Sequence, residues 1–299
     1  MSTWSLATIT SVNGPLGCIE QGGKLYALAP SLARVGLAIG DVAGLFADWD
    51  RSRAALDRAA GQLATADIVT GSRLAPLLYP GKIMCAGANY FDHLAEMGMP
   101  GAKKADQRLF FFMKPPRNAI VGEGDTVCMP IGTTSFDWEV ELAAVIGKRA
   151  RNVSVSDAMA HVAGYSVAID FSARDHNRAA ETFYKLDWVA GKANDTCCPL
   201  GPRFVPASAI TNPQDIGLKL SVNGAVKQDG RSTDMIFSIA EQISIASRIM
   251  TLDPGDLVLT GTPAGVGAPK GTFLSVGDRV DASIEGIGTL SVRIQPANG

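Results

Sequence analysis

Two glutamates that are two positions apart, Glu139 and Glu141, lie in a mostly apolar stretch at residues 136–148. The stretch predicts a strand, and because side chains alternate along a strand, both carboxylates face the same side of it. Two neighbouring carboxylates repel each other, and among apolar residues they are poorly solvated. They therefore need a cation or a shared proton, although a solvated strand face with two ordinary surface acids would have the same spacing.

A third carboxylate, Asp170, ends a second strand-like run at residues 164–170. If the two strands bring the three acids together, the resulting site has oxygen ligands and neither sulfur nor imidazole. Such a ligand set suits a hard divalent cation, Mg²⁺ or Mn²⁺, rather than zinc.

A histidine and a glutamate form a second candidate pair, His93 and Glu96. Residues 89–98 predict a short helix that Asn89 caps and Gly98 ends. Side chains three positions apart on a helix can touch, and a carboxylate that contacts an imidazole orients the ring and raises its basicity, as a general base requires. An ordinary ion pair on a helix surface would have the same spacing.

Two lysines follow apolar runs. Lys114 comes directly before two prolines, and Lys192 ends the run 188–192, which we expect to be a strand. A lysine in such a place can also simply extend to solvent. The glycine-rich stretch 260–267 lacks the Gly-Lys-Ser/Thr ending of a phosphate loop. It predicts a tight loop at a strand end, where backbone amides can approach a ligand.

The elements that position these residues belong to a strand-rich chain. Its 299 residues are 46% hydrophobic and include 32 glycines and 16 prolines, which indicates a sizeable core and many turns. Residues 218–224 predict a strand that enters a hairpin turn, and residues 235–250 predict an amphipathic helix. We interpret residues 1–78 as a small N-terminal domain and residues 79–299 as a catalytic domain.

Charge and targeting signals exclude several classes of partner. A net charge of −2 gives no electrostatic case for nucleic acid or an anionic membrane. No apolar run is long enough to span a bilayer, and the N-terminus has no signal peptide, so we expect a cytoplasmic protein. The five cysteines include no C-x-x-C pair, and we expect them to be reduced and mostly buried.

Taken in order, these motifs resemble the fumarylacetoacetate hydrolase family over residues 80–299. The resemblance is carried by a series of short segments in register: 87–97, 114–115, 137–142, 164–165, 170–175, 191–192, 222–224, 235–239 and 259–263. Each segment is weak by itself, and the series in order is specific. The N-terminal 78 residues resemble the small leading domain of longer bacterial members.

The resemblance implies an α+β fold with a mixed β-sandwich or β-roll core, few helices, and a homodimer. It also implies one Mg²⁺ or Mn²⁺ per subunit and a helix that closes over the substrate. The implied site residues are the metal ligands Glu139, Glu141 and Asp170, the catalytic residues His93, Glu96 and Lys192, and the substrate-binding residues Lys114, Arg174 and Thr262.

The activity that the resemblance implies is metal-dependent hydrolysis of the C–C bond of a 2,4-dioxo acid, such as fumarylpyruvate or a compound like fumarylacetoacetate. The products are pyruvate and a carboxylic acid. Three alternatives stay open: a decarboxylase of oxaloacetate or a related 2-oxo acid, a hydratase or isomerase of an unsaturated 2-oxo acid in aromatic catabolism, and a catalytically silent binding protein. Candidates for recognising the acyl group are Phe91, Met97, Met99, Phe183 and Tyr184.

Overall fold

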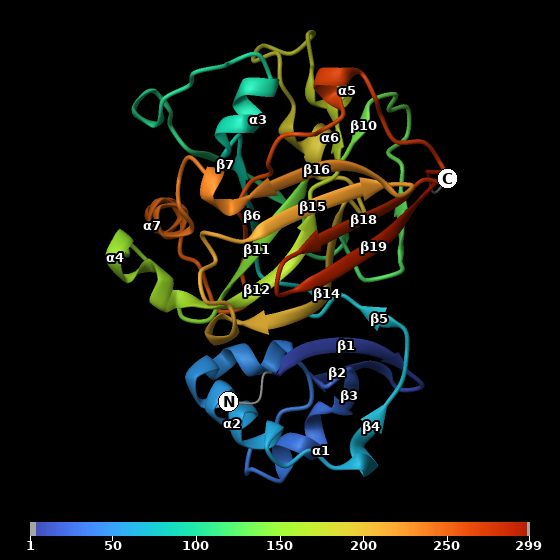
Figure 1. Cartoon of the computed structure of the whole chain (residues 1–299), viewed down its shortest axis with the longest axis vertical. Coiled ribbons are helices and arrows are strands. Elements are labelled where there is room, and N and C mark those ends of the chain that lie inside the picture. The colour runs from blue at the N-terminus through green and yellow to red at the C-terminus, as the bar shows by residue number, and fades with distance from the viewer. Residues whose placement is uncertain (1–3, 298–299) are drawn as a thin grey trace.

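A computed structural model describes residues 4–297 and has the mixed, sheet-rich α+β fold that the sequence predicts (Figure 1). In these residues the larger sheet has twelve strands: β1 (Ser5–Ser11), β2 (Gly14–Gln21), β3 (Lys24–Ala27), β4 (Ile68–Val69), β5 (Arg73–Leu74), β6 (Ile83–Gly87), β7 (Phe110–Lys114), β8 (Ile120–Val121), β11 (Val140–Ile146), β12 (Val162–Ile169), β14 (Cys198–Pro206) and β17 (Leu257–Leu259).

A second sheet has the strand order β16-β15-β18-β19-β9, and a short ladder pairs β10 with β13. Their bounds are β9 (Thr126–Cys128), β10 (Phe136–Asp137), β13 (Ser172–Ala173), β15 (Gly217–Val222), β16 (Ala225–Arg231), β18 (Arg279–Ile284) and β19 (Gly288–Gln295). The helices are α1 (Leu28–Ala33), α2 (Trp49–Ala60), α3 (Phe91–Glu96), α4 (Val155–Ala158), α5 (Arg174–Asn177), α6 (Trp188–Lys192) and α7 (Ile239–Ile249).

Strand β11 is an interior strand of the larger sheet, and every residue of it is buried. It pairs antiparallel with β12 and β17, and its side chains alternate between two cores. Val140, Leu142 and Ala144 belong to the core shared with the second sheet, whereas Ala143 and Val145 belong to the core on the opposite face. This alternation is the predicted one, and it places Glu139 and Glu141 together on the face opposite Val140.

The predicted strand 136–148 is interrupted. Its first two residues form β10, which pairs with β13, and β11 begins only at Val140. The register of β11 on β12 pairs Val140 with Ile169, so Asp170 follows directly beside Glu139. The backbone N–H of Asp170 donates to the carbonyl of Glu139 at 2.9 Å. Antiparallel pairing therefore brings the third acid to the first two.

The second sheet packs on β11 and β12 and contains the predicted hairpin. Strands β15 and β16 are joined at Asn223 and Gly224, which both have positive φ angles (51° and 80°), as a tight hairpin turn requires. The larger core lies between the two sheets and includes Leu218 and Leu220 of β15 and Leu290 of β19.

The N-terminal residues continue the larger sheet, because β1 pairs with β2 on one side and with β14 on the other (Figure 1). A second core joins this region to the rest of the chain, and in it the rings of Trp49 and Phe204 lie edge to face with centroids 5.4 Å apart. The boundary at residue 78 stays a prediction. No helix in residues 4–297 has the length and apolarity needed to cross a membrane.

Two helices differ from the sequence predictions. Helix α7 begins at Ile239 rather than Met235, because Ser238 and Glu241 form a capping box that fixes its first turn. The run 188–192 was predicted as a strand, and that is wrong: it is helix α6, whose first turn is held by the Asp187 side chain, which accepts from the backbone N–H of Ala190 at 2.9 Å.

Helix α3 forms as predicted and ends before Gly98, whose φ is 94°. Asn89 is not its cap, which is a correction to the sequence prediction: the N-cap is Tyr90. The buried Asn89 amide instead donates to the carbonyls of Thr260 and Phe237 and so ties the start of this segment to two loops. All five cysteines are free thiols, and four of them are buried.

Candidate active site

Three buried carboxylates meet where β11, β12 and the segment after β10 come together. Glu139, Glu141 and Asp170 each offer an oxygen, and these three oxygens lie within 4.8 Å of one another. The Glu141 carboxylate accepts from the backbone N–H of Gly261 at 2.6 Å. Burial, followed by repulsion from Asp170 and Glu139, holds the pKa of Glu141 well above its usual range.

Lys192, the last residue of α6, bridges two of the three acids. Its ammonium lies 2.7 Å from Glu139 Oε2 and 2.7 Å from Asp170 Oδ2. Burial alone would raise the pKa of Glu139, but Lys192 and Arg174 outweigh it and hold that pKa well below its usual range. Glu139 is therefore ionised, whereas Glu141 has no cation at ion-pair distance in residues 4–297.

Lys114 lies beneath Asp170 rather than in the cavity, although the family resemblance implied a substrate-binding role for it. Its fully buried ammonium donates to the carbonyls of Phe171, Lys192 and Cys197 at 2.9, 2.5 and 2.9 Å. An ammonium has three N–H groups, so these bonds use all of them. The ammonium is also 2.7 Å from Asp170 Oδ1, and that contact is one of charge alone.

Arg174 is held by two acids of the motif that begins at Asp137. Its Nε donates to Asp137 at 2.9 Å, and its terminal nitrogen donates to Glu139 Oε1 at 2.6 Å. Burial opposes the charge of Arg174, but Glu139 and Asp137 more than compensate and raise its pKa. Asp137 was part of the sequence motif without a predicted role, and its fully buried carboxylate also accepts from the backbone N–H groups of Gly267 and Ala268.

His93 and Glu96 make the contact that the helix spacing predicts. The His93 Nδ1 lies 2.7 Å from Glu96 Oε1, and both side chains are largely buried. Because Nδ1 is engaged by a carboxylate, it carries the hydrogen and Nε2 is the basic nitrogen. The second oxygen of Glu96 accepts from the backbone N–H of Gly265 at 2.8 Å, and Trp138 Nε1 donates to the carbonyl of the same glycine at 3.1 Å.

The glycine-rich loop after β17 presents its backbone amides to carboxylates of the protein itself. Gly261 donates to Glu141, Ala264 to Asp92, Gly265 to Glu96, and Gly267 to Asp137. The sequence predicted that these amides would approach a ligand, and in this structure they hold the site acids instead. Neither Asp92 nor Asp137 had a sequence signal that pointed to this loop.

Thr262 and Gln228 close the gap between the loop and β11. The Thr262 hydroxyl donates to the carbonyl of Val140 at 2.8 Å and accepts from the Gln228 amide at 2.8 Å. The side-chain amide oxygen of Gln228, Oε1, accepts from the backbone N–H of Val140 at 2.9 Å. The Gln228 side chain, contributed by the second sheet, therefore fixes the backbone between Glu139 and Glu141, and no sequence pattern indicated it.

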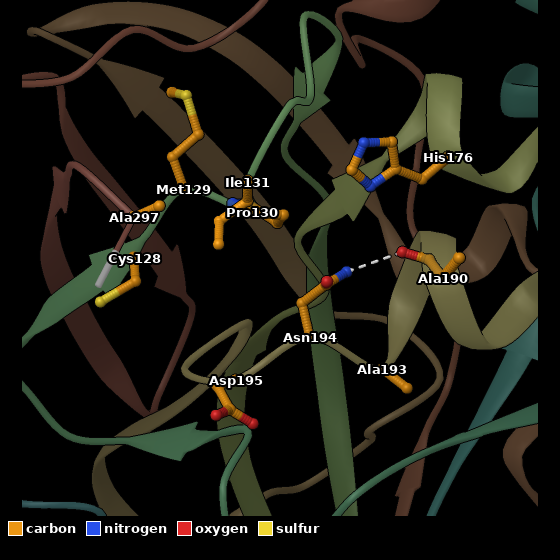
Figure 2. A pocket seen from close by; sticks show the side chains of 10 residues that line it. All are labelled: Cys128, Met129, Pro130, Ile131, His176, Ala190, Ala193, Asn194, Asp195 and Ala297. Carbon is orange, nitrogen blue, oxygen red and sulfur yellow. Dashed lines mark hydrogen bonds between the residues drawn. The ribbon is translucent and has the colours of Figure 1, made fainter. Parts of the chain in front are cut away.

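A cavity of about 330 Å³ unites most of the predicted site residues. The lining includes His93, Glu139, Glu141, Arg174, Lys192 and Thr262, whereas Lys114, Glu96 and Asp170 lie behind it. Of the acyl-group candidates, Met97 and Met99 line the cavity and Phe91, Phe183 and Tyr184 do not. Another cavity, of about 500 Å³, contains His176 and Asn194 and none of the predicted site residues (Figure 2).

The acid cluster fits a divalent cation on two observations. Asp170 Oδ1 is a buried oxygen with no hydrogen-bond donor in residues 4–297, and Glu141 lacks a countercharge there. The cluster has four carboxylates but only three cationic side chains at ion-pair distance in the described residues. The carboxylates are those of Asp137, Glu139, Glu141 and Asp170, and the cations are Lys114, Arg174 and Lys192. A hard cation with oxygen ligands would supply both the missing contact and the missing charge.

Comparison with known proteins places the chain in a family. Residues 82–295 match the family description "Fumarylacetoacetate (FAA) hydrolase C-terminal". The chain belongs to the fumarylacetoacetate hydrolase family. It is 42% identical over 219 residues to a mitochondrial oxaloacetate tautomerase from Bos taurus, an alignment that covers 73% of this chain and 67% of that protein.

Two solved structures of the fumarylacetoacetate hydrolase fold were determined with Mn²⁺ and pyruvate. Fumarylpyruvate hydrolase from Pseudomonas aeruginosa is 34% identical, with a TM-score of 0.66 over 76% of this chain and 93% of that one. Maleylpyruvate hydrolase from Sphingobium sp. is 28% identical, with a TM-score of 0.75 over 98% of this chain and 100% of that one. The family membership and the fold class that the sequence predicted are thereby confirmed.

Proposed function

We propose that this protein is a metal-dependent hydrolase that cleaves the C3–C4 bond of an acylpyruvate, giving pyruvate and a carboxylic acid. The observation that carries the proposal is the single cavity in which Glu139, Glu141 and Lys192 stand beside His93. Two structural relatives act on acylpyruvates by name and contain Mn²⁺ with pyruvate, which supports this choice.

Glu139, Glu141 and Asp170 would hold the cation, Mg²⁺ or Mn²⁺, through oxygen atoms. When bound, the cation would supply Lewis-acid activation and a template for the 2-oxo carboxylate end of the substrate. Lys114 keeps Asp170 in place from behind, and Gln228 fixes the backbone between the two glutamates. These residues make the cluster rigid before substrate arrives.

His93 would act as the general base. Its Nε2 takes a proton from a water molecule while Glu96 stabilises the imidazolium that forms. The oxygen of that water bonds to the C4 carbonyl carbon of the substrate. The C3–C4 bond then breaks, its electron pair passes to C3 as the enolate of pyruvate, and C4 leaves as a carboxylic acid.

Lys192 and Arg174 would stabilise the negative charge that develops on the pyruvate fragment. Lys192 lies between Glu139 and Asp170, and Arg174 is held by Asp137 and Glu139, so neither side chain needs to be ordered during the reaction. The imidazolium of His93 would then return its proton to C3 of the enolate, which regenerates the base and releases pyruvate. Water is consumed once per turnover.

The test is pyruvate release from acylpyruvates with Mg²⁺ or Mn²⁺, with EDTA as the metal-free control. Loss of a general base costs about 10²–10⁴-fold in rate. We expect His93→Ala to lose hydrolysis by that factor while calorimetry still detects Mn²⁺ binding. Equal loss of metal binding and hydrolysis would contradict the assigned roles, and no turnover of any 2-oxo acid would favour a silent binding protein.

A second candidate substrate is oxaloacetate, because the bovine relative is named an oxaloacetate tautomerase. The same His93 could move a proton between C3 and the 2-oxo oxygen. A decarboxylase would instead break the C3–C4 bond of oxaloacetate without an attacking water, which releases CO₂ and leaves the same pyruvate enolate. Oxaloacetate assays that follow the enol absorbance and CO₂ separately distinguish these reactions from hydrolysis. Action on an unsaturated 2-oxo acid would appear as turnover without pyruvate.

We also propose a cytoplasmic homodimer with a small N-terminal domain at residues 1–78. The homodimer and the small domain rest on the family resemblance, and the cytoplasmic location is the expectation drawn from the sequence. Light scattering of the purified protein tests the dimer, and limited proteolysis near residue 78 tests the domain boundary.

A further inference from the structure

The cavity wall carries one cation that the site does not use. Three cationic side chains line the cavity: Arg174, Arg178 and Lys192. Arg174 is held by Asp137 and Glu139, and Lys192 by Glu139 and Asp170. The Arg178 side chain has no carboxylate at ion-pair distance and no hydrogen-bond partner within the part of the chain that the structure describes.

The backbone of Arg178 is fixed although its side chain is not. Its N–H donates to the carbonyl of Arg174 at 3.3 Å at the end of α5, so the two arginines lie one helical turn apart. A β-bridge pairs Arg178 with Leu186, and the Asp187 N–H donates to Asn177 at 2.9 Å. Arg178 therefore lines the cavity from an ordered turn, and its side chain is also exposed to solvent at the edge of the cavity.

Apart from the polar side chains of the site and Asn177, the wall is apolar. Leu94, Met97 and Phe110 line it, and the rings of Phe112 and Trp188 stack there with centroids 5.2 Å apart. A volume of about 330 Å³ corresponds to roughly ten water molecules, which is room for a short carbon chain as well as a 2-oxo carboxylate. An uncommitted guanidinium beside an apolar wall suits a chain that ends in a second carboxylate.

We propose that Arg178 binds a carboxylate at the distal end of the substrate, so that the preferred substrate is a 2-oxo diacid. This inference rests on the proposed function and names its substrate class. Arg178 acts in specificity rather than in the bond-breaking step, because it contacts neither the acid cluster nor the His93–Glu96 pair in the described residues. A guanidinium recognises a carboxylate in a bidentate manner, which a lysine would not reproduce.

The test compares unreactive 2-oxo acids of equal length with and without a terminal carboxylate. Calorimetry of the Mn²⁺-loaded protein would measure 2-oxoglutarate against 2-oxopentanoate, and 2-oxoadipate against 2-oxohexanoate. A charged hydrogen bond corresponds to about 10- to 100-fold in affinity. We expect the wild type to prefer the better-fitting diacid by that factor, and Arg178→Gln to lose the preference while its affinity for the monoacids changes less than about 2-fold.

Lys185→Gln is the matched control, because it removes the same charge from the same loop and Lys185 does not line the cavity. It should keep the diacid preference. Equal affinity of the wild type for diacid and monoacid, or a preference that survives in Arg178→Gln, would overturn the inference while the proposed function stands. If metal-loaded wild type binds none of these 2-oxo acids, both the inference and the proposed function fail.

Discussion

Replacing Lys114 by methionine would separate two roles for a lysine that the sequence places near the substrate. The structure buries its ammonium completely, against Asp170 Oδ1 and the carbonyls of Phe171, Lys192 and Cys197. Asp170 raises the pKa of Lys114 even though burial opposes the charge, so the side chain is ionised in the folded protein. Methionine keeps the length of the side chain and removes only the charge and the three hydrogen bonds.

The size of the effect follows from what the substitution leaves behind. Asp170 keeps Lys192 as a partner on its other oxygen, but three carbonyls lose their donor. Breaking a buried ion pair from one side costs about 3–5 kcal/mol, and part of that cost is the unpaired carbonyls. For a domain of this size each kcal/mol lowers Tm by about 2–4 °C, so we expect Tm to fall by about 6–20 °C.

The assay is thermal unfolding followed by circular dichroism, together with KM for the best acylpyruvate. Lys104→Met is the control, because Lys104 pairs with Glu241 where both side chains are partly exposed, and such pairs contribute about 0–1 kcal/mol. A Lys114→Met protein with unchanged Tm and a raised KM would refute the reasoning. It would restore Lys114 to the substrate-binding group.

Three further predictions follow from the same contacts. Because the pKa of Glu141 is raised in the metal-free protein, the folded state holds a proton there that the unfolded state loses above about pH 4.3. Stability of the metal-free protein should therefore fall as pH rises above that value. Mn²⁺ binding just above that pH should release a proton from Glu141, seen by calorimetry in buffers of different ionisation enthalpy and absent in Glu141→Gln. Trp138→Phe removes the donor to Gly265 and should lower kcat about 2- to 10-fold with Mn²⁺ affinity unchanged; equal losses in both would contradict a role through Glu96. Gly265→Ala should lower Tm measurably, because its φ is 108° and a Cβ would lie 2.1 Å from the Lys227 carbonyl oxygen; an unchanged Tm would mean that the loop can shift without cost.

Much of the acid cluster was predictable because it depends on the period of a strand. Alternation placed Glu139 and Glu141 on one face, and the end of the next strand pointed to Asp170. The His93–Glu96 contact was predictable for the same reason, because side chains that are three positions apart on a helix lie on the same face and can meet. Local periodicity carries such information without any knowledge of the fold.

The supporting residues were not predictable, because their partners are distant in the sequence. Gln228 reaches the backbone of Val140 from another sheet, and Lys114 reaches carbonyls that are 57 to 83 positions away. The helix at 188–192 was mistaken for a strand because its apolar residues are typical of both, and the Asp187 cap that decides the matter is a single side chain. Arg178 has no local pattern at all, and only the cavity reveals it.

The loop after β17 holds both the acid cluster and the His93–Glu96 pair in fixed positions. Gly261 donates to Glu141 of the acid cluster, and Gly265, four positions later, donates to Glu96 of the base pair. Gly261 and Gly265 both have positive φ angles, of 94° and 108°, which let two amides of one short loop point at separate carboxylates. A shift of this short loop must therefore move a proposed metal ligand and the orienting partner of His93 together. Metal affinity and the orientation of the His93 ring should therefore change together when the loop is altered, and separately when a single carboxylate is replaced.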